Sequence, residues 1–177
     1  MILYHGTTLE QAEQIWKTGS IKCRIKRSFE ANPYFEGTTD GFVYLTNKLC
    51  LAYYYGNSKI ISCECKNKNV CIFKVDISDE LLLADLDELK VKTRKMYSEE
   101  TTIEDSLRIC GCVRCAQDIS ILGAKYVIIP GTTNVEVSEE ENRICRNFSS
   151  LALNHANEKA KVEILKNITD KYKWKEL

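Results

Sequence analysis

The order of apolar and polar positions predicts that strands dominate the middle of the chain and helices its end. Short apolar or alternating runs predict strands over residues 2–5, 42–46, 59–65, 70–77, 118–122 and 126–129. The polar residues 66–69 lie between two of these runs, so we interpret them as a hairpin turn. This pattern is typical of an α+β fold, and the length of 177 residues fits one domain over 1–177.

Capping residues predict where the helices begin. Thr8 followed by Gln11 predicts a helix over 9–18, which Gly19 ends, and Ser138 with Glu141 opens a helical C-terminal third. Two more helices are expected over about 48–55 and within 98–110. The stretch 81–89 is both acidic and apolar, so its structure stays open, and residues 20–41 read as a long loop.

The charge of the chain changes the picture little. Lys and Arg together number 25, as do Asp and Glu, so no global positive field is available to hold nucleic acid. The basic run 22–27 is interpreted as a solvated loop rather than a phosphate contact. No apolar run approaches the ~20 residues of a membrane span, and the first residues lack the pattern of a signal peptide. We therefore expect a cytoplasmic protein without a membrane partner.

Nine cysteines are an odd number, so they cannot all pair within the chain, and we expect reduced thiols. Two clusters raise the alternative of a zinc site: Cys63, Cys65 and Cys71, and Cys110, Cys112 and Cys115. Neither cluster has the paired spacing of a strong zinc motif. The alternation around Cys63 and Cys65 also fits the inward face of a strand, so no metal ligand is assigned.

Two motifs carry candidate chemistry. The first is Leu3-Tyr4-His5-Gly6-Thr7-Thr8, which leads into a helix, and the second is Gly41-Phe42-Val43-Tyr44-Leu45-Thr46-Asn47, followed by Ala52 and Tyr54. In this order they resemble the ADP-ribosyltransferase superfamily, in the branch with a His-Tyr-acid triad that includes poly(ADP-ribose) polymerases and diphtheria-type toxins. The resemblance implies antiparallel sheets that are split to form an NAD cleft, with the strands at 2–5 and 42–46 side by side on one wall.

The resemblance also implies a role for each residue. His5 would hold a hydroxyl of the adenosine ribose, and the backbone of Gly6 would match the carboxamide of nicotinamide. Thr7 would add a hydroxyl to a ribose. Tyr44 would stack on the nicotinamide ring, and Tyr54 would supply the opposing face, for which Tyr53 and Tyr55 are alternatives.

The third member of the triad is expected as an acid at the start of a late strand. Residues 116–123 have that outline and place Asp118 there, on a strand whose neighbour should carry His5 or Tyr44. Gln117 and Glu104 are the other candidates, and Asp118 as a simple strand cap is the competing interpretation. In the family this acid stabilises the cation that forms as nicotinamide leaves.

The function implied is a transferase that uses NAD as co-substrate and passes ADP-ribose to a protein, a nucleic acid or another acceptor. Residues 20–41 would be its lid. One alternative is a module of the same fold that binds NAD or ADP-ribose without catalysis. Another is an RNA 2′-phosphotransferase, which shares the first motif but expects histidine in the second strand, where this chain has Tyr44. The acceptor and the oligomeric state stay open.

Overall fold

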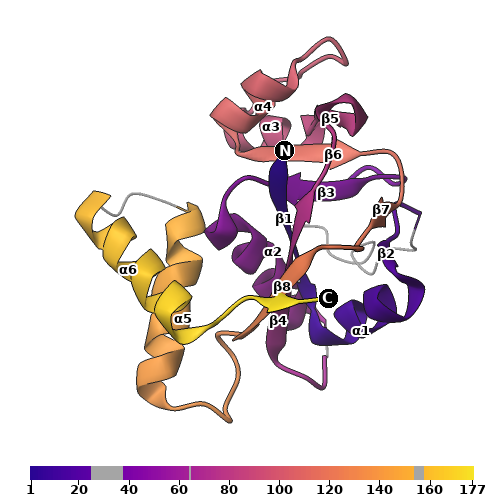
Figure 1. The fold of residues 1–177 in the computed structure, drawn as a ribbon. Helices are drawn as coiled ribbons and strands as arrows, with labels where there is room; N and C mark the ends of the chain where they lie inside the picture. Colours follow the sequence, from indigo (N-terminus) through magenta and orange to yellow (C-terminus); the bar gives the residue numbers. More distant parts are fainter. Residues whose placement is uncertain (25–37, 64, 154–157) are drawn as a thin grey trace.

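The computed structural model describes residues 1–24, 38–63, 65–153 and 158–177, which form the α+β fold expected from the sequence (Figure 1). The strands are β1 (Ile2–Thr8), β2 (Ser20–Ile21), β3 (Val43–Thr46), β4 (Asn69–Asp76), β5 (Leu82–Ala84), β6 (Cys112–Cys115), β7 (Ile119–Ser120), β8 (Lys125–Pro130) and β9 (Lys175–Glu176). The α-helices are α1 (Leu9–Thr18), α2 (Leu49–Ser62), α3 (Leu86–Thr93), α4 (Ile103–Ile109), α5 (Glu139–Leu153) and α6 (Glu158–Lys171), and a short 3₁₀ turn covers Asp79–Leu81.

Seven strands form one sheet in the order β5-β6-β3-β1-β4-β8-β9, and β2 pairs with β7 in a second, two-stranded sheet. The strand pairs are all antiparallel within the described residues. The ladder is uneven, because β1 and β4 share seven residue pairs whereas β1 and β3 share the single pair Tyr4–Thr46. The strands at the two motifs are therefore neighbours, as expected, but they meet at a narrow seam.

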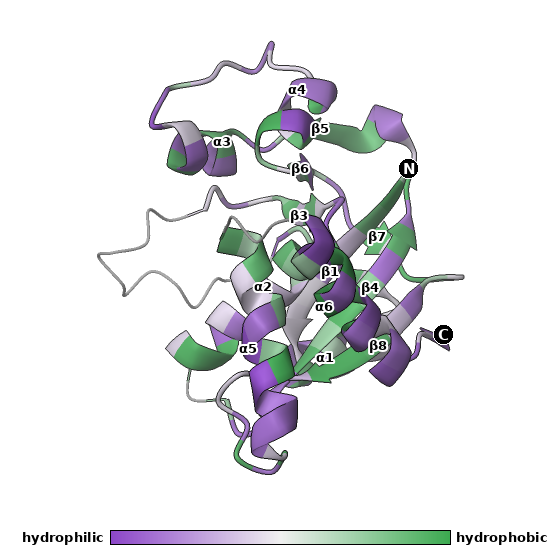
Figure 2. Cartoon of the chain, turned by 90° about the vertical axis from the view of Figure 1, so that its left-hand side faces the viewer, coloured by the Kyte–Doolittle hydropathy of each residue, from purple (hydrophilic) through white to green (hydrophobic). Residues whose placement is uncertain are grey.

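Both faces of the large sheet are buried, which explains why β4 is apolar along most of its length. Cys71, Phe73 and Val75 point into a core beneath α1, whereas Val70 and Ile72 point into a core formed with α2, α5 and α6. Figure 2 shows the apolar strands in green behind α6, whose residues are mostly polar. A third, smaller core joins α2 and α3 to β5 and the start of β6.

The expected strand at 59–65 and its hairpin turn are wrong, because α2 continues through Ser62. Gly56, which follows the expected helix over 48–55, lies inside α2. A Cβ atom at Gly56 would lie 2.5 Å from Val70 Cγ1 and 3.1 Å from Thr7 N, so this glycine lets α2 lie directly on the sheet. The alternation that suggested a strand is the end of a buried helical face, which includes Ile60.

Most other elements lie where the pattern predicts them. The ambiguous stretch 81–89 contains the end of the 3₁₀ turn, then β5 and the start of α3, and the strand expected at 118–122 shrinks to β7. Of the long loop, residues 20–21 form β2, and residues 25–37 lie outside the described part of the chain. Among the described helices, none combines the length and the apolar character needed to cross a membrane.

Candidate functional site

His5 and Tyr44 come together at the seam between β1 and β3. The His5 Nδ1 atom donates a hydrogen bond to the backbone carbonyl of Tyr44, with 3.0 Å between the two atoms. Because a carbonyl can only accept, the bond assigns the Nδ1 proton, and a neutral ring then has its acceptor at Nε2. The structure thus fixes the orientation of the imidazole through the strand that carries Tyr44.

Gly6 and Thr7 follow His5 on β1 and pack against helices. A Cβ atom on Gly6 would lie 1.7 Å from the carbonyl oxygen of Ala52, so the backbones of β1 and α2 are in direct contact. The Thr7 hydroxyl is buried and donates to Gln11 Oε1 at 2.5 Å. Ligand contacts by these two residues stay predictions, and the structure gives both a role in the packing of β1.

The three consecutive tyrosines on α2 have different surroundings. Tyr53 is fully buried against Phe148, and its hydroxyl donates to the Pro130 carbonyl at 2.6 Å, so this ring belongs to the core. Tyr54 is partly exposed and packs on Tyr55. The Tyr55 hydroxyl lies 3.8 Å from Cys112 Sγ at the start of β6. Of the three rings, Tyr55 therefore reaches toward the strand that pairs with β3.

Asp118 does not lie beside β1 or β3. It precedes β7, whose partner is β2, so the expectation about its neighbouring strand is wrong. Its carboxylate accepts from Cys23 N at 3.0 Å and pairs with Lys22 Nζ at 2.9 Å. The Cys23 backbone bond, with help from Lys22, lowers the pKa of Asp118 to about 2. Asp118 anchors residues 22–23, and its neighbour Gln117 is exposed, as is Glu104 on α4.

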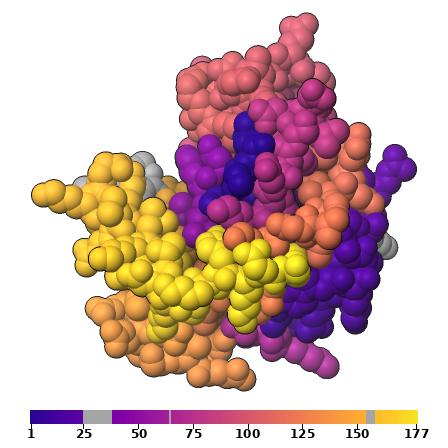
Figure 3. Space-filling model, in the orientation of Figure 1, coloured from indigo at the N-terminus to yellow at the C-terminus, as the bar shows by residue number. Residues whose placement is uncertain are grey.

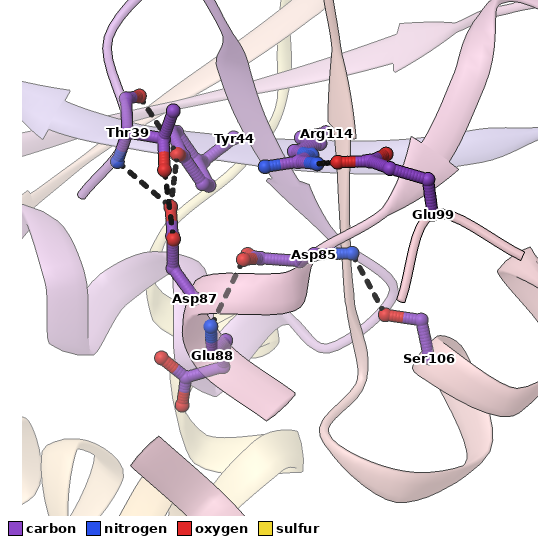
Figure 4. A network of polar contacts seen from close by, with 8 residues as sticks. All are labelled: Thr39, Tyr44, Asp85, Asp87, Glu88, Glu99, Ser106 and Arg114. Atoms are coloured by element: carbon purple, nitrogen blue, oxygen red, sulfur yellow. Dashed lines mark hydrogen bonds and ion pairs between the residues drawn. The ribbon is translucent and has the colours of Figure 1, made fainter. Parts of the chain in front are cut away.

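A different carboxylate contacts Tyr44 (Figure 4). Asp87 Oδ2 lies 2.5 Å from the Tyr44 hydroxyl, and the same carboxylate accepts from Thr39 N at 2.8 Å and from Thr39 Oγ1 at 2.9 Å. Burial alone would raise the pKa of Asp87, but the hydrogen bonds from Tyr44 and Thr39 outweigh it and hold the pKa below its ordinary value. The Tyr44 ring is thus held next to a carboxylate that stays ionised.

Asp85 caps α3 two residues before Asp87. Its side chain accepts from Glu88 N at 3.0 Å as an N-cap, and its backbone amide donates to Ser106 Oγ at 3.0 Å. Only 3% of the residue is exposed, and this burial raises the pKa of Asp85 to about 7. Near neutral pH the carboxyl is therefore divided between its charged and neutral forms.

Arg114 on β6 completes the group. It lies opposite Tyr44 in the β3–β6 ladder, so both side chains leave the same face of the sheet. The guanidinium carbon lies 4.2 Å from the centre of the Phe42 ring, and Nη2 donates to Glu99 Oε1 at 3.0 Å. Figure 4 shows the guanidinium group between Tyr44 and Glu99.

Sequence reasoning missed these partners of Tyr44, although signals existed. Asp85 and Glu88 have the same capping spacing that identified the helices at Thr8 and Ser138. Arg114 is a charge between buried strand positions, which calls for a partner. Nothing in the local pattern, however, indicates that residues 85–87 pack beside residue 44.

The cysteine clusters do not converge. None of the nine cysteines, all within the described residues, forms a disulfide, and no group of three or more potential ligands that could hold a metal occurs in that part of the chain. The alternation of β6 explains this for one cluster, because Cys112 lies in the small core with α3 whereas Cys115 lies in the core beneath α1.

A separate, open depression of about 500 Å³ lies on the α1 side of the sheet. It is lined by Trp16, Ile121, Tyr126, Glu176 and Leu177. Figure 3 shows the C-terminal end of the chain, in yellow, next to the indigo surface of α1. None of the residues expected at the site lines this depression.

Comparisons of the chain with protein-family models, with curated proteins and with solved structures found no match.

Proposed function

We propose that the protein is an NAD-dependent ADP-ribosyltransferase whose reaction centre is formed by His5, Tyr44 and Asp87. One observation carries the proposal. The histidine and the tyrosine of the two motifs meet on neighbouring strands, and an ionised carboxylate lies at the tyrosine hydroxyl. The structure has one seven-stranded sheet in which β1 and β3 share a single residue pair, and a split of the sheet at this seam is part of the proposal.

Each residue has a defined task in this proposal. The Tyr44 ring stacks on nicotinamide, and His5 binds a hydroxyl of the adenosine ribose. As the bond between nicotinamide and ribose breaks, positive charge develops on the sugar, and a fixed carboxylate stabilises it. Asp87 replaces Asp118 in this task, because Asp87 lies at the Tyr44 hydroxyl whereas Asp118 precedes β7, which pairs with β2.

NAD is the co-substrate, and a protein, a nucleic acid or water receives the ADP-ribose. Nine cysteines without a disulfide support a reducing compartment such as the cytoplasm.

Release of nicotinamide from NAD by purified protein tests the proposal. Asp87→Asn should lower turnover by more than tenfold, roughly 1.4 kcal/mol or more, with little change in NAD affinity, because the charge matters most in the transition state. Asp118→Asn is the matched control, since it removes the same charge from the bend before β7. Tyr44→Phe separates the contribution of the hydroxyl bond from that of the carboxylate.

Full activity in Asp87→Asn together with a large loss in Asp118→Asn would return the acid to Asp118. Tyr44→Ala should instead weaken NAD binding, because stacking holds the bound ring in the ground state as well.

Arg114 favours a second candidate, a module that binds NAD or ADP-ribose without cleaving it. A guanidinium opposite Tyr44 opposes the positive charge that nicotinamide carries in NAD and that moves to the ribose in the transition state, whereas ADP-ribose has no cationic group. Calorimetric binding of NAD without release of nicotinamide, with several acceptors tested, would establish this module in place of the enzyme.

A further inference from the structure

Arg114 is almost fully buried, which is rare for an arginine unless its charge and its donors are paired. Its side chain is 3% exposed, on a strand where its neighbours Val113 and Cys115 are core residues. The guanidinium has five N–H donors and no acceptor, so burial at this level ordinarily requires a full set of partners. The hydrogen-bond partners of Arg114 therefore decide whether its donors are satisfied.

The described residues satisfy only one side of the guanidinium. Nη2 meets both oxygens of Glu99, at 3.0 and 3.3 Å, and the Glu99 side chain is itself 74% exposed. The Nε atom is buried and has no hydrogen-bond partner among the described residues. A buried donor without a partner on a charged group is costly and rare. We therefore expect the Nε–H to donate to an acceptor that a bound molecule supplies.

The surrounding charges select the kind of acceptor. Glu99 binds Arg114, and the carboxyl groups of Asp85 and Asp87 are close enough to interact with it electrostatically. Three acids around one cation disfavour a phosphate group. A neutral hydroxyl group can bind the cation and an acid together, because its oxygen accepts from the Nε–H while its proton is donated to a carboxylate.

The neighbouring side chains agree with a sugar. Phe42 lies against the guanidinium, and Tyr44 projects from the opposite position of the ladder with Asp87 at its hydroxyl. Aromatic faces next to paired donors and acceptors match a furanose ring with vicinal hydroxyls. In the proposed NAD complex Tyr44 stacks on nicotinamide, so the sugar nearest Tyr44 is the ribose attached to nicotinamide.

We propose that Arg114 is a ligand-binding residue whose Nε–H donates to a hydroxyl oxygen of this ribose, in a subsite shared with Asp87. The inference rests on the proposed function, and it deepens it by naming the group that is recognised at β6. It applies equally to the transferase and to the binding module.

The test measures the affinity of ADP-ribose, which cannot release nicotinamide, and of two analogues whose terminal ribose lacks the 2′- or the 3′-hydroxyl. The unaltered protein should bind one analogue on the order of tenfold more weakly than ADP-ribose, because a hydrogen bond to a charged group is lost. Arg114→Lys keeps the charge but not the Nε–H, so it should bind ADP-ribose on the order of tenfold more weakly and no longer distinguish that analogue.

Glu99→Gln is the control for Arg114→Lys, because it removes the charge of the exposed partner and leaves the guanidinium in place. It should retain the discrimination. The Nε–H resonance of Arg114, followed by ¹⁵N NMR in the unaltered protein, should shift when ADP-ribose is added, and this readout does not depend on how well the lysine variant folds.

Additive losses for the variant and the analogue, or an unmoved Nε–H resonance at saturation, would overturn the role of Arg114 while leaving the proposed function standing. If neither NAD nor ADP-ribose binds the unaltered protein, the proposed function and the ribose subsite fail together.

Discussion

Gly6 shows how one residue can decide whether the site forms. The carbonyl oxygen of Ala52 occupies the position that a side chain at residue 6 would take, so α2 rests on the backbone of β1 just after His5. The orientation of His5 toward Tyr44 therefore depends on a glycine at the next position. The motif residue first considered for ligand contact is also a packing requirement.

We predict that Gly6→Ala destabilises the protein by more than about 3 kcal/mol, because the helix must move away from the strand to accept a methyl group. Urea unfolding would measure the loss. Gly123→Ala is the comparison: its φ of 75° is strained for alanine but no atom lies within 4 Å, so it should cost only about 1 kcal/mol. Equal losses of unfolding free energy in the two variants would show that the contact with Ala52 does not determine the cost of Gly6→Ala.

The residues of the site were predictable to different degrees. His5 and Tyr44 lie in motifs that are continuous in sequence, so the resemblance of these motifs to a family indicates them. Asp87 and Arg114 are separated from Tyr44 by 43 and 70 residues and reach it only through the packing of α3 and the β3–β6 register. Asp118 had the right sequence outline, but the short β7 pairs with β2 and carries it to another edge.

Among the elements, α3 and α4 are joined through Asp85, which caps the first helix and meets Ser106 of the second. The sequence predicts the termini of such helices better than their packing, because caps are local whereas the contact between helices is not. For the same reason the sequence predicts too early an end for α2. Gly56 and the alternation over 59–65 are local signals, and the contact of α2 with the sheet overrides them.

We predict that Asp85 makes the protein less stable as pH rises. Its pKa is about 7 in the folded chain against an ordinary 3.8, so the folded state holds a proton that the unfolded state has lost. The stabilisation from this group is complete below pH 3.8 and disappears as pH rises through 7, by up to about 4 kcal/mol.

Denaturant titrations between pH 4 and pH 8 would measure this effect. Asp85→Asn keeps an acceptor at the cap but does not titrate, so its stability should depend less on pH over this range than that of the unaltered protein. A variant with the same pH dependence as the parent would assign the effect to other groups.

At the scale of the whole molecule, the burial of the cysteines makes their reactivity a probe of the fold. Cys50, Cys63 and Cys65 are partly exposed, and the other six are buried. Burial raises the pKa of Cys71 to about 12, which suppresses the reactive thiolate.

We predict that a thiol reagent modifies at most these three cysteines rapidly in the folded protein and all nine in denaturant without reductant. Mass spectrometry of the labelled chain would count them. Fewer than nine labels after denaturation would reveal a disulfide, and rapid labelling of Cys71 in native buffer would contradict the packing of β4.

The seam between β1 and β3 has a consequence for rigidity. Among the described residues, Tyr4–Thr46 is the one β1–β3 pair, so side-chain packing contributes more than a hydrogen-bonded ladder to holding β5, β6 and β3 to the remaining strands. One group of strands carries Tyr44 and Arg114, and the other carries His5. A molecule bound by both groups would link them across this seam, so we expect binding to stiffen the protein beyond the residues that the molecule touches.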